Sequence, residues 1–318
     1  MLAALGVPAR SSLAQILGRT PRVGILILAS LASVETIIEG FRANLRELGY
    51  VEGRGINFDI QSAEGNAERL PELAAQLVAR KVDIIVTGGG NVSTIAARNA
   101  TATIPIVMTS SISAVESGLV QSLARPGGNI TGLTVPLDLG IKQIQLLQEL
   151  IPSLSRVTIV VRHDPALAEA REQSKLLAKQ FLQVALDIVE VRSPDDVARA
   201  LGAVREAKPN AVIVSPDPLL YQQREQILRF MRAARIPDMY TAPDIVDDGG
   251  LMAYSPTPQE IYRGVARFVD RLLKGAKPAD LPVEQPTKFA LVLNLRTARS
   301  LGLKLPQSVL LRADRVIE

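Results

Sequence analysis

The chain has 318 residues and a formal net charge of +4, with one histidine and no cysteine. The lack of cysteine excludes disulfides, thiol catalysis and cysteine-type zinc sites, and a lone histidine makes other metal sites unexpected. The positive residues are scattered, and aromatic residues make up only 3% of the chain, so surfaces on which bases could stack are not expected. We therefore predict no nucleic-acid partner, no metal and no cofactor.

The first 20 residues stand apart from the rest of the chain. A short apolar stretch, Met1 to Val7, precedes Ser12-Leu13-Ala14, which has small residues at both recognition positions of a signal-peptidase site. We expect residues 1–20 to be the remnant of an export signal, with a disordered tail as the alternative. No apolar run in the sequence reaches the roughly 18 residues needed to span a bilayer.

From Arg22 onward, short apolar runs alternate with amphipathic segments. Strands are predicted at 23–28, 56–60, 83–86 and 106–108, and helices at 36–48, 67–80 and 91–99. Strands separated by helices of this length favour a parallel α/β sheet covered on both faces.

Pro126-Gly127-Gly128 and Pro136 mark a break, after which the rhythm restarts. Strands are predicted at 157–161, 187–191, 211–214 and 238–241, followed by a strand at 251–254, a helix at 260–274, a Pro-rich passage at 278–286 and a helix at 295–301. The length of the chain also fits about two domains of 100–200 residues each. The sequence therefore predicts two serial, doubly wound parallel-sheet lobes.

Three passages carry a resemblance to one family. They are Asp280–Phe289 (DLPVEQPTKF), Phe41–Val51 (FRANLRELGYV) and Gly118–Gly132 (GLVQSLARPGGNITG). Together they resemble the tryptophan/tyrosine-type substrate-binding proteins of bacterial ABC importers, from Arg22 to the end of the chain.

The resemblance implies a periplasmic-binding-protein type I fold with a three-segment hinge near Leu133–Leu137, Asp247–Gly250 and Leu281–Gln285. It implies an N-terminal lobe of residues 21–135 and 251–282, and a C-terminal lobe of residues 136–250 and 283–318. It also implies a monomeric, periplasmic solute carrier that performs no chemistry and delivers a small solute, an amino acid or a similar aromatic or apolar carboxylate, to ABC permease subunits.

Candidate binding residues follow from the rule that open α/β sheets bind ligands beyond the carboxyl ends of their strands. Gly88-Gly89-Gly90-Asn91, between a strand and a helix, would offer backbone N–H groups to a carboxylate or phosphate, although a simple tight turn is the alternative. The full set of predicted ligand-binding residues is Ser30, Gly89, Gly90, Asn91, Thr109, Ser110, His163, Ser215, Asp217, Asp244 and Tyr254.

Several of these residues have plainer interpretations. Asp217 precedes Pro218, so it would serve equally as a helix cap, and Ser and Thr at strand ends are common caps. An apolar subsite is expected from Tyr254, Met108 and aliphatic residues. Tyr254 would otherwise fill the core.

Two other functions are weaker. A cytosolic effector-sensing domain would share the fold, but about 20 residues before the first strand cannot hold a helix-turn-helix. A nucleotide-dependent enzyme would need an acidic ribose partner about 20 residues after the triple glycine, where Thr109-Ser110 stands instead.

Overall fold

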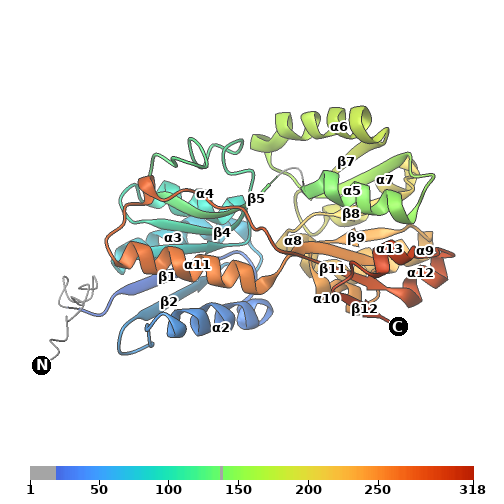
Figure 1. Cartoon of the computed structure of the whole chain (residues 1–318). Coiled ribbons are helices and arrows are strands. Elements are labelled where there is room, and N and C mark those ends of the chain that lie inside the picture. The colour runs from blue at the N-terminus through green and yellow to red at the C-terminus, as the bar shows by residue number, and fades with distance from the viewer. Residues whose placement is uncertain (1–18, 137–138) are drawn as a thin grey trace, which may run out of the picture.

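The computed structural model describes residues 19–136 and 139–318. Two α/β lobes lie side by side and are joined by several chain crossings (Figure 1). The predicted export-signal remnant falls almost entirely outside the described residues, as does Leu137 at the end of the first predicted hinge. Within the described part, no helix is long and apolar enough to cross a membrane.

The first lobe is built on a five-stranded parallel sheet in the order β2-β1-β3-β4-β5. Helices α2 and α11 cover one face, and α3 and α4 cover the other. The bounds are β1 (Arg22–Ile27), α2 (Leu31–Glu47), β2 (Asn57–Ser62), η1 (Ala67–Arg69), α3 (Leu70–Ala79), β3 (Ile84–Gly88), α4 (Asn91–Ala100), β4 (Ile106–Ile112), β5 (Ile130–Val135), α11 (Pro258–Leu273) and η3 (Pro278–Asp280).

The second lobe is built on a seven-stranded sheet in the order β12-β11-β10-β9-β8-β6-β7. All neighbours run parallel except β10 and β11, which are antiparallel. The bounds are α5 (Leu139–Leu150), β6 (Arg156–Arg162), η2 (Pro165–Leu167), α6 (Ala168–Leu182), β7 (Ala185–Val191), α7 (Asp196–Ala207), β8 (Ala211–Val214), α8 (Pro218–Gln222), α9 (Arg224–Ala234), β9 (Asp238–Tyr240), α10 (Pro243–Asp247), β10 (Met252–Pro256), β11 (Phe289–Asn294), α12 (Leu295–Leu301), α13 (Gln307–Leu310) and β12 (Arg315–Ile317).

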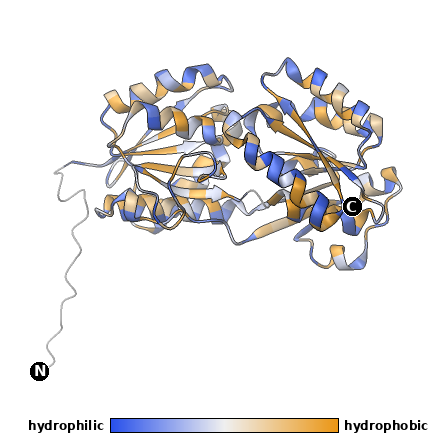
Figure 2. Cartoon of the chain, turned by 90° about the horizontal axis from the view of Figure 1, so that it is seen from above, coloured by the Kyte–Doolittle hydropathy of each residue, from blue (hydrophilic) through white to orange (hydrophobic). Residues whose placement is uncertain are grey.

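Each sheet is sandwiched between two apolar layers, as expected for strands buried on both faces. Helix α11 illustrates the sequence logic, because Val265, Phe268, Val269 and Leu272 recur at helical spacing and are all buried against the first sheet. Figure 2 shows the same division along most helices, with one hydrophobic and one hydrophilic side. In the second lobe, α5 and α6 lie on one face of the sheet, and α7, α9 and α10 on the other.

The chain crosses between the lobes three times, and one crossing differs from the expectation. Strand β10 pairs with β9 and β11 in the second sheet, so the chain returns to the first lobe after Pro256 and not at residue 251. The segment Asp247–Gly250, predicted as a hinge, lies inside the second lobe, where Asp247 forms a 2.8 Å ion pair with Arg315. The glycine pair there ends helix α10 and does not mark a crossing.

Strands β5, β11 and β12 were not expected from the sequence. In β5, Gly132 permits close approach of the neighbouring strand, because a Cβ at this position would lie 2.3 Å from the carbonyl oxygen of Met108. In the sequence, Gly132 and the flanking Pro126-Gly127-Gly128 and Pro136 indicate a linker instead of a strand. The third crossing segment pairs with β5 before the chain enters the second lobe, because Glu284 N donates to Gly132 O at 2.9 Å.

Candidate functional site

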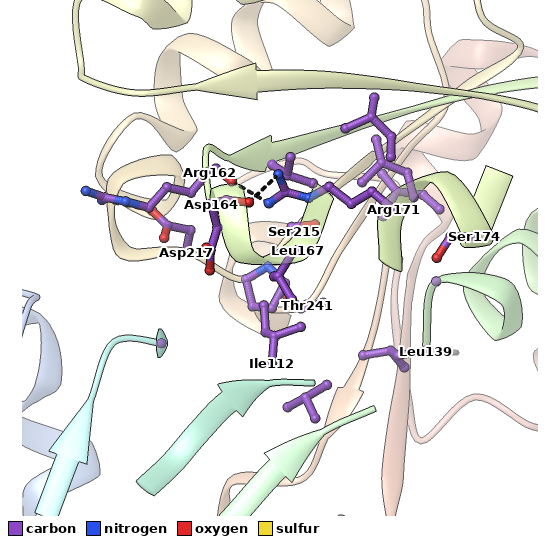
Figure 3. A pocket seen from close by; sticks show the side chains of 18 of the residues that line it. Ile112, Leu139, Arg162, Asp164, Leu167, Arg171, Ser174, Ser215, Asp217 and Thr241 are labelled. Atoms are coloured by element: carbon purple, nitrogen blue, oxygen red, sulfur yellow. Dashed lines mark hydrogen bonds and ion pairs between the residues drawn. The ribbon is translucent and has the colours of Figure 1, made fainter. Parts of the chain in front are cut away.

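A cleft lies between the lobes, at the carboxyl ends of the central strands of both sheets. The first lobe contributes Gly89–Asn91, after β3, and Ile112, at the end of β4. The second lobe contributes the loops after β6, β8 and β9, and Figure 3 shows Arg162, Asp164, Ser215, Asp217 and Thr241 gathered there.

The first-lobe wall is the N-terminus of α4. Gly89 and Gly90 have φ angles of 96° and 85°, and a Cβ on Gly89 would lie 2.8 Å from the Cβ of Leu28, so the turn requires glycine. The Asn91 side chain fixes the helix start to β4, donating to Ile112 O at 3.1 Å and accepting from Ile112 N at 2.8 Å. Backbone N–H groups at a helix N-terminus that faces a cleft attract an anionic group.

The second-lobe wall carries an ion pair. Arg162 Nη1 lies 3.8 Å from Asp217 Oδ1, and both side chains are largely buried. Burial raises the pKa of the Asp217 carboxyl, although the charge of Arg162 and backbone hydrogen bonds act to lower it. Asp217 also caps α8 by accepting from Leu219 N at 2.8 Å, which confirms the capping interpretation. Arg162 Nη1 is buried without a hydrogen-bond partner in the described part of the chain.

A polar network supports the loop after β6. His163 Nδ1 lies 2.5 Å from Glu190 Oε2, and Arg171 pairs with the other oxygen of this carboxylate. Burial acts to raise the pKa of Glu190, but its hydrogen bond with His163 and the charge of Arg171 outweigh burial, so the pKa is lowered. Arg171 also donates to Arg162 O at 2.8 Å and Asp164 O at 3.2 Å, which holds the loop in place.

No group of three His, Cys, Asp or Glu side chains in residues 19–136 and 139–318 is arranged to hold a metal ion.

The cleft continues into the second lobe as an apolar space between α5 and α6. Its aliphatic lining comes from α5, from Leu167 at the end of η2 and from strands β6, β7 and β8, while α6 contributes Arg171 and Ser174. This apolar wall does not involve the expected Tyr254 and Met108. Tyr254 stacks on Phe289 with ring centroids 5.2 Å apart, and Met108 is fully buried in the core of the first lobe.

The structure brings together six of the eleven predicted binding residues. Those that line the cleft are Gly89, Gly90, Asn91, His163, Ser215 and Asp217. The other five, Ser30, Thr109, Ser110, Asp244 and Tyr254, are not among the described residues that line it. Asp244, for example, accepts a hydrogen bond from the Tyr221 hydroxyl. A binding role for any of the eleven stays a prediction.

The sequence prediction missed Arg162, Asp164 and Arg171 as site residues. Arg162 and Asp164 flank His163 at the end of a predicted strand, so the strand-end rule had already selected this loop. Arg171 lies on α6, and the rule does not reach helices. The apolar space depends on how α5 and α6 pack, which hydrophobic periodicity does not specify.

Comparison with known proteins decides the family. Residues 22–317 match the family model described as ABC transporter substrate binding protein. The chain belongs to this family. Like its relatives, this family member has two α/β lobes of the periplasmic-binding-protein type I kind.

A tyrosine-binding protein of Clostridioides difficile is 25% identical to this family member over 284 residues, which is 89% of this chain and 81% of that protein. A Streptococcus pneumoniae ABC domain in complex with L-Trp shares 25% identity with a TM-score of 0.84, covering 94% of this chain and all of the other. A conserved domain protein of Vibrio cholerae shares 26% identity with a TM-score of 0.85 over the same coverage.

Proposed function

We propose that this family member is an extracytoplasmic carrier that closes its lobes around one amino acid or similar small carboxylate and delivers it to an ABC permease. One observation carries the proposal: the N-terminus of α4 faces the buried Arg162–Asp217 pair across a cleft with an apolar wall. The tyrosine-binding relative and the L-Trp complex support a solute of this class.

The charges of the cleft suit a zwitterion. The backbone N–H groups that follow Gly90 and Nη1 of Arg162, which has no hydrogen-bond partner in the described part of the chain, would receive the carboxylate. The carboxylate of Asp217 would accept a hydrogen bond from an ammonium group, since Arg162 lies 3.8 Å away and does not satisfy it fully. Apolar atoms of the solute would face the space between α5 and α6.

Contacts between the lobes would form the closed state of the carrier. Asn91 Nδ2 donates to Asp164 Oδ2 at 3.3 Å across the cleft. Gly89 lies against Pro218, and Gly65 lies against Gln222, whose amide nitrogen would be 2.6 Å from a Cβ on Gly65. A solute that contacts both lobes adds to these contacts and shifts a hinge equilibrium towards closure. The three crossings would act as the hinge.

A thermal-shift screen with calorimetric follow-up tests the proposal. The panel contains L-amino acids, their des-amino carboxylates, sugars, nucleosides and nucleotides. Ligand linkage predicts about 2.7 kcal/mol of stabilisation at 100 times Kd, which the screen detects. Stabilisation by amino acids or carboxylates alone supports the carrier. Stabilisation by nucleotides alone would contradict it and favour a nucleotide-dependent enzyme.

A further inference from the structure

The apolar space between α5 and α6 is a distinct part of the cleft, and we refer to it as the tail chamber. It is lined by Leu139, Ile144, Ile159, Leu167, Ile188 and Ile213. Leu139 and Ile144 lie in the first turns of α5, and Leu167 ends η2, just before α6. The other three residues lie in strands β6, β7 and β8, all within the second lobe. Figure 3 shows Leu139 and Leu167 on either side of this space, with the polar loops to one side.

The polar side chains beside the tail chamber already have partners. Gln143 Nε2 donates to Tyr254 O at 3.2 Å, and Ser174 Oγ donates to Ala170 O at 2.9 Å. Arg171 is held by Glu190 and by two backbone carbonyls. The six side chains that define the tail chamber are all aliphatic and offer no hydrogen bond to a polar group at the far end of a ligand, and burying such a group without a partner is unfavourable.

The tail chamber also contains no aromatic ring among its described lining residues. A flat aromatic solute would meet only aliphatic side chains there and would gain no ring pairing. A flexible aliphatic chain gains from each buried methylene, because the hydrophobic effect scales with the apolar area removed from water.

The geometry points to a solute with an extended aliphatic tail, seated in the tail chamber, behind a carboxylate or α-amino carboxylate head in the cleft. This inference rests on the proposed carrier function and narrows its substrate class to aliphatic carboxylates whose tails are longer than those of ordinary amino acids. The tail binds within the second lobe alone, so it contributes affinity before the lobes close.

A chain-length series tests the inference. Titration calorimetry with L-alanine, L-norvaline, L-norleucine and L-2-aminooctanoate measures how Kd changes with the tail. Each methylene that enters the tail chamber is expected to tighten binding about fourfold. L-2-aminooctanoate is expected to bind more tightly than L-tyrosine and L-tryptophan.

Gly140→Leu gives an independent test in the same assay. Gly140 lies in the first turn of α5, and a Cβ there would point into the tail chamber, 3.8 Å from Ile159 Cδ1. A leucine would fill the chamber, so the variant is expected to lose the chain-length gain while it still binds L-alanine. Gly202→Leu, at an open position of α7, is the matched control and is expected to behave as wild type.

The outcomes separate two kinds of failure. If short and long members bind equally well, or if Gly140→Leu and Gly202→Leu show the same chain-length gain, the tail assignment is overturned while the carrier function stands. If no amino acid or carboxylate binds the wild-type protein, both proposals fail. The wild-type series needs no substitution, so it decides the matter even if one variant does not fold.

Discussion

Replacing Asp217 with Asn is expected to weaken the binding of an α-amino acid strongly and to leave its des-amino analogue almost unaffected. In the proposed complex, the Asp217 carboxylate accepts a hydrogen bond from the ammonium group of the solute. Hydrogen bonds to charged groups contribute about 1.5–3 kcal/mol, which corresponds to a loss of roughly 10- to 150-fold in affinity. Asparagine keeps the shape of the side chain and an oxygen that accepts from Leu219 N, so the cap of α8 is retained.

The same carboxylate predicts how affinity depends on pH. Burial raises the pKa of Asp217 in the free protein, and a neighbouring ammonium group favours the ionised form. Binding an amino acid therefore releases a proton when the pH is at or below the pKa of the free carboxyl, and affinity falls on acidification. Titration in buffers with different ionisation enthalpies counts this proton. The des-amino analogue and the Asp217→Asn variant are expected to show no such release.

Asp196→Asn is the control for the Asp217 experiment. Asp196 also accepts a backbone hydrogen bond near a helix start, from Arg192 N at 3.0 Å, but it lies on α7 away from the cleft. This variant is expected to bind like wild type. Equal losses for the amino acid and its des-amino analogue in Asp217→Asn would refute the ammonium contact, because only a general distortion of the cleft weakens both.

Two further predictions concern the fold. Burial raises the pKa of Asp238 from 3.8 to about 6, although the hydrogen bond from the Tyr240 hydroxyl acts to lower it. The stability that protonation of Asp238 contributes is therefore fully present below about pH 4 and is lost as the pH rises through about 6. Wild type should therefore gain about 1.4 kcal/mol relative to Asp238→Asn between about pH 7.5 and pH 5 in urea unfolding, and parallel pH profiles would contradict this. The Glu260 carboxylate accepts hydrogen bonds from Thr287 N at 2.8 Å and Lys288 N at 3.0 Å. Glu260→Ala should therefore speed hydrogen exchange of these two amides about fivefold, with Glu260→Gln in between. Unchanged exchange would show that these hydrogen bonds do not hold the third crossing in place.

The sequence was sufficient to predict most of the fold, because long amphipathic patterns and buried apolar runs determine their elements locally. Helix α12 begins and ends where its pattern predicts, and α11 differs only at its ends. Strands β5 and β11 were missed because each lies next to a crossing, where Gly132 and the Pro-rich passage indicated irregular structure. Only their pairing partners make these segments strands, and pairing between distant segments is not a local property.

Only part of the lining of the cleft could be predicted from the sequence, for a related reason. The strand-end rule selects an edge of the sheet, and the turn at Gly89 and the loops at His163 and Asp217, which it selected, all line the cleft. It does not specify which loops along that edge face the other lobe, so Asp244 was included. It also leaves out residues on helices, such as Arg171, whose position depends on tertiary packing.

The central claim is that a solute closes the two lobes, and a distance between the lobes tests it most directly. The chain contains no cysteine, so Glu68→Cys in the first lobe and Gln180→Cys in the second allow specific labelling at exposed positions. Single-molecule energy transfer between the labels is predicted to shift to a shorter, narrower distance distribution as an amino acid or aliphatic carboxylate is added, with a midpoint equal to the calorimetric Kd. A distance that stays the same while such a ligand demonstrably binds would contradict closure as the mechanism of this protein.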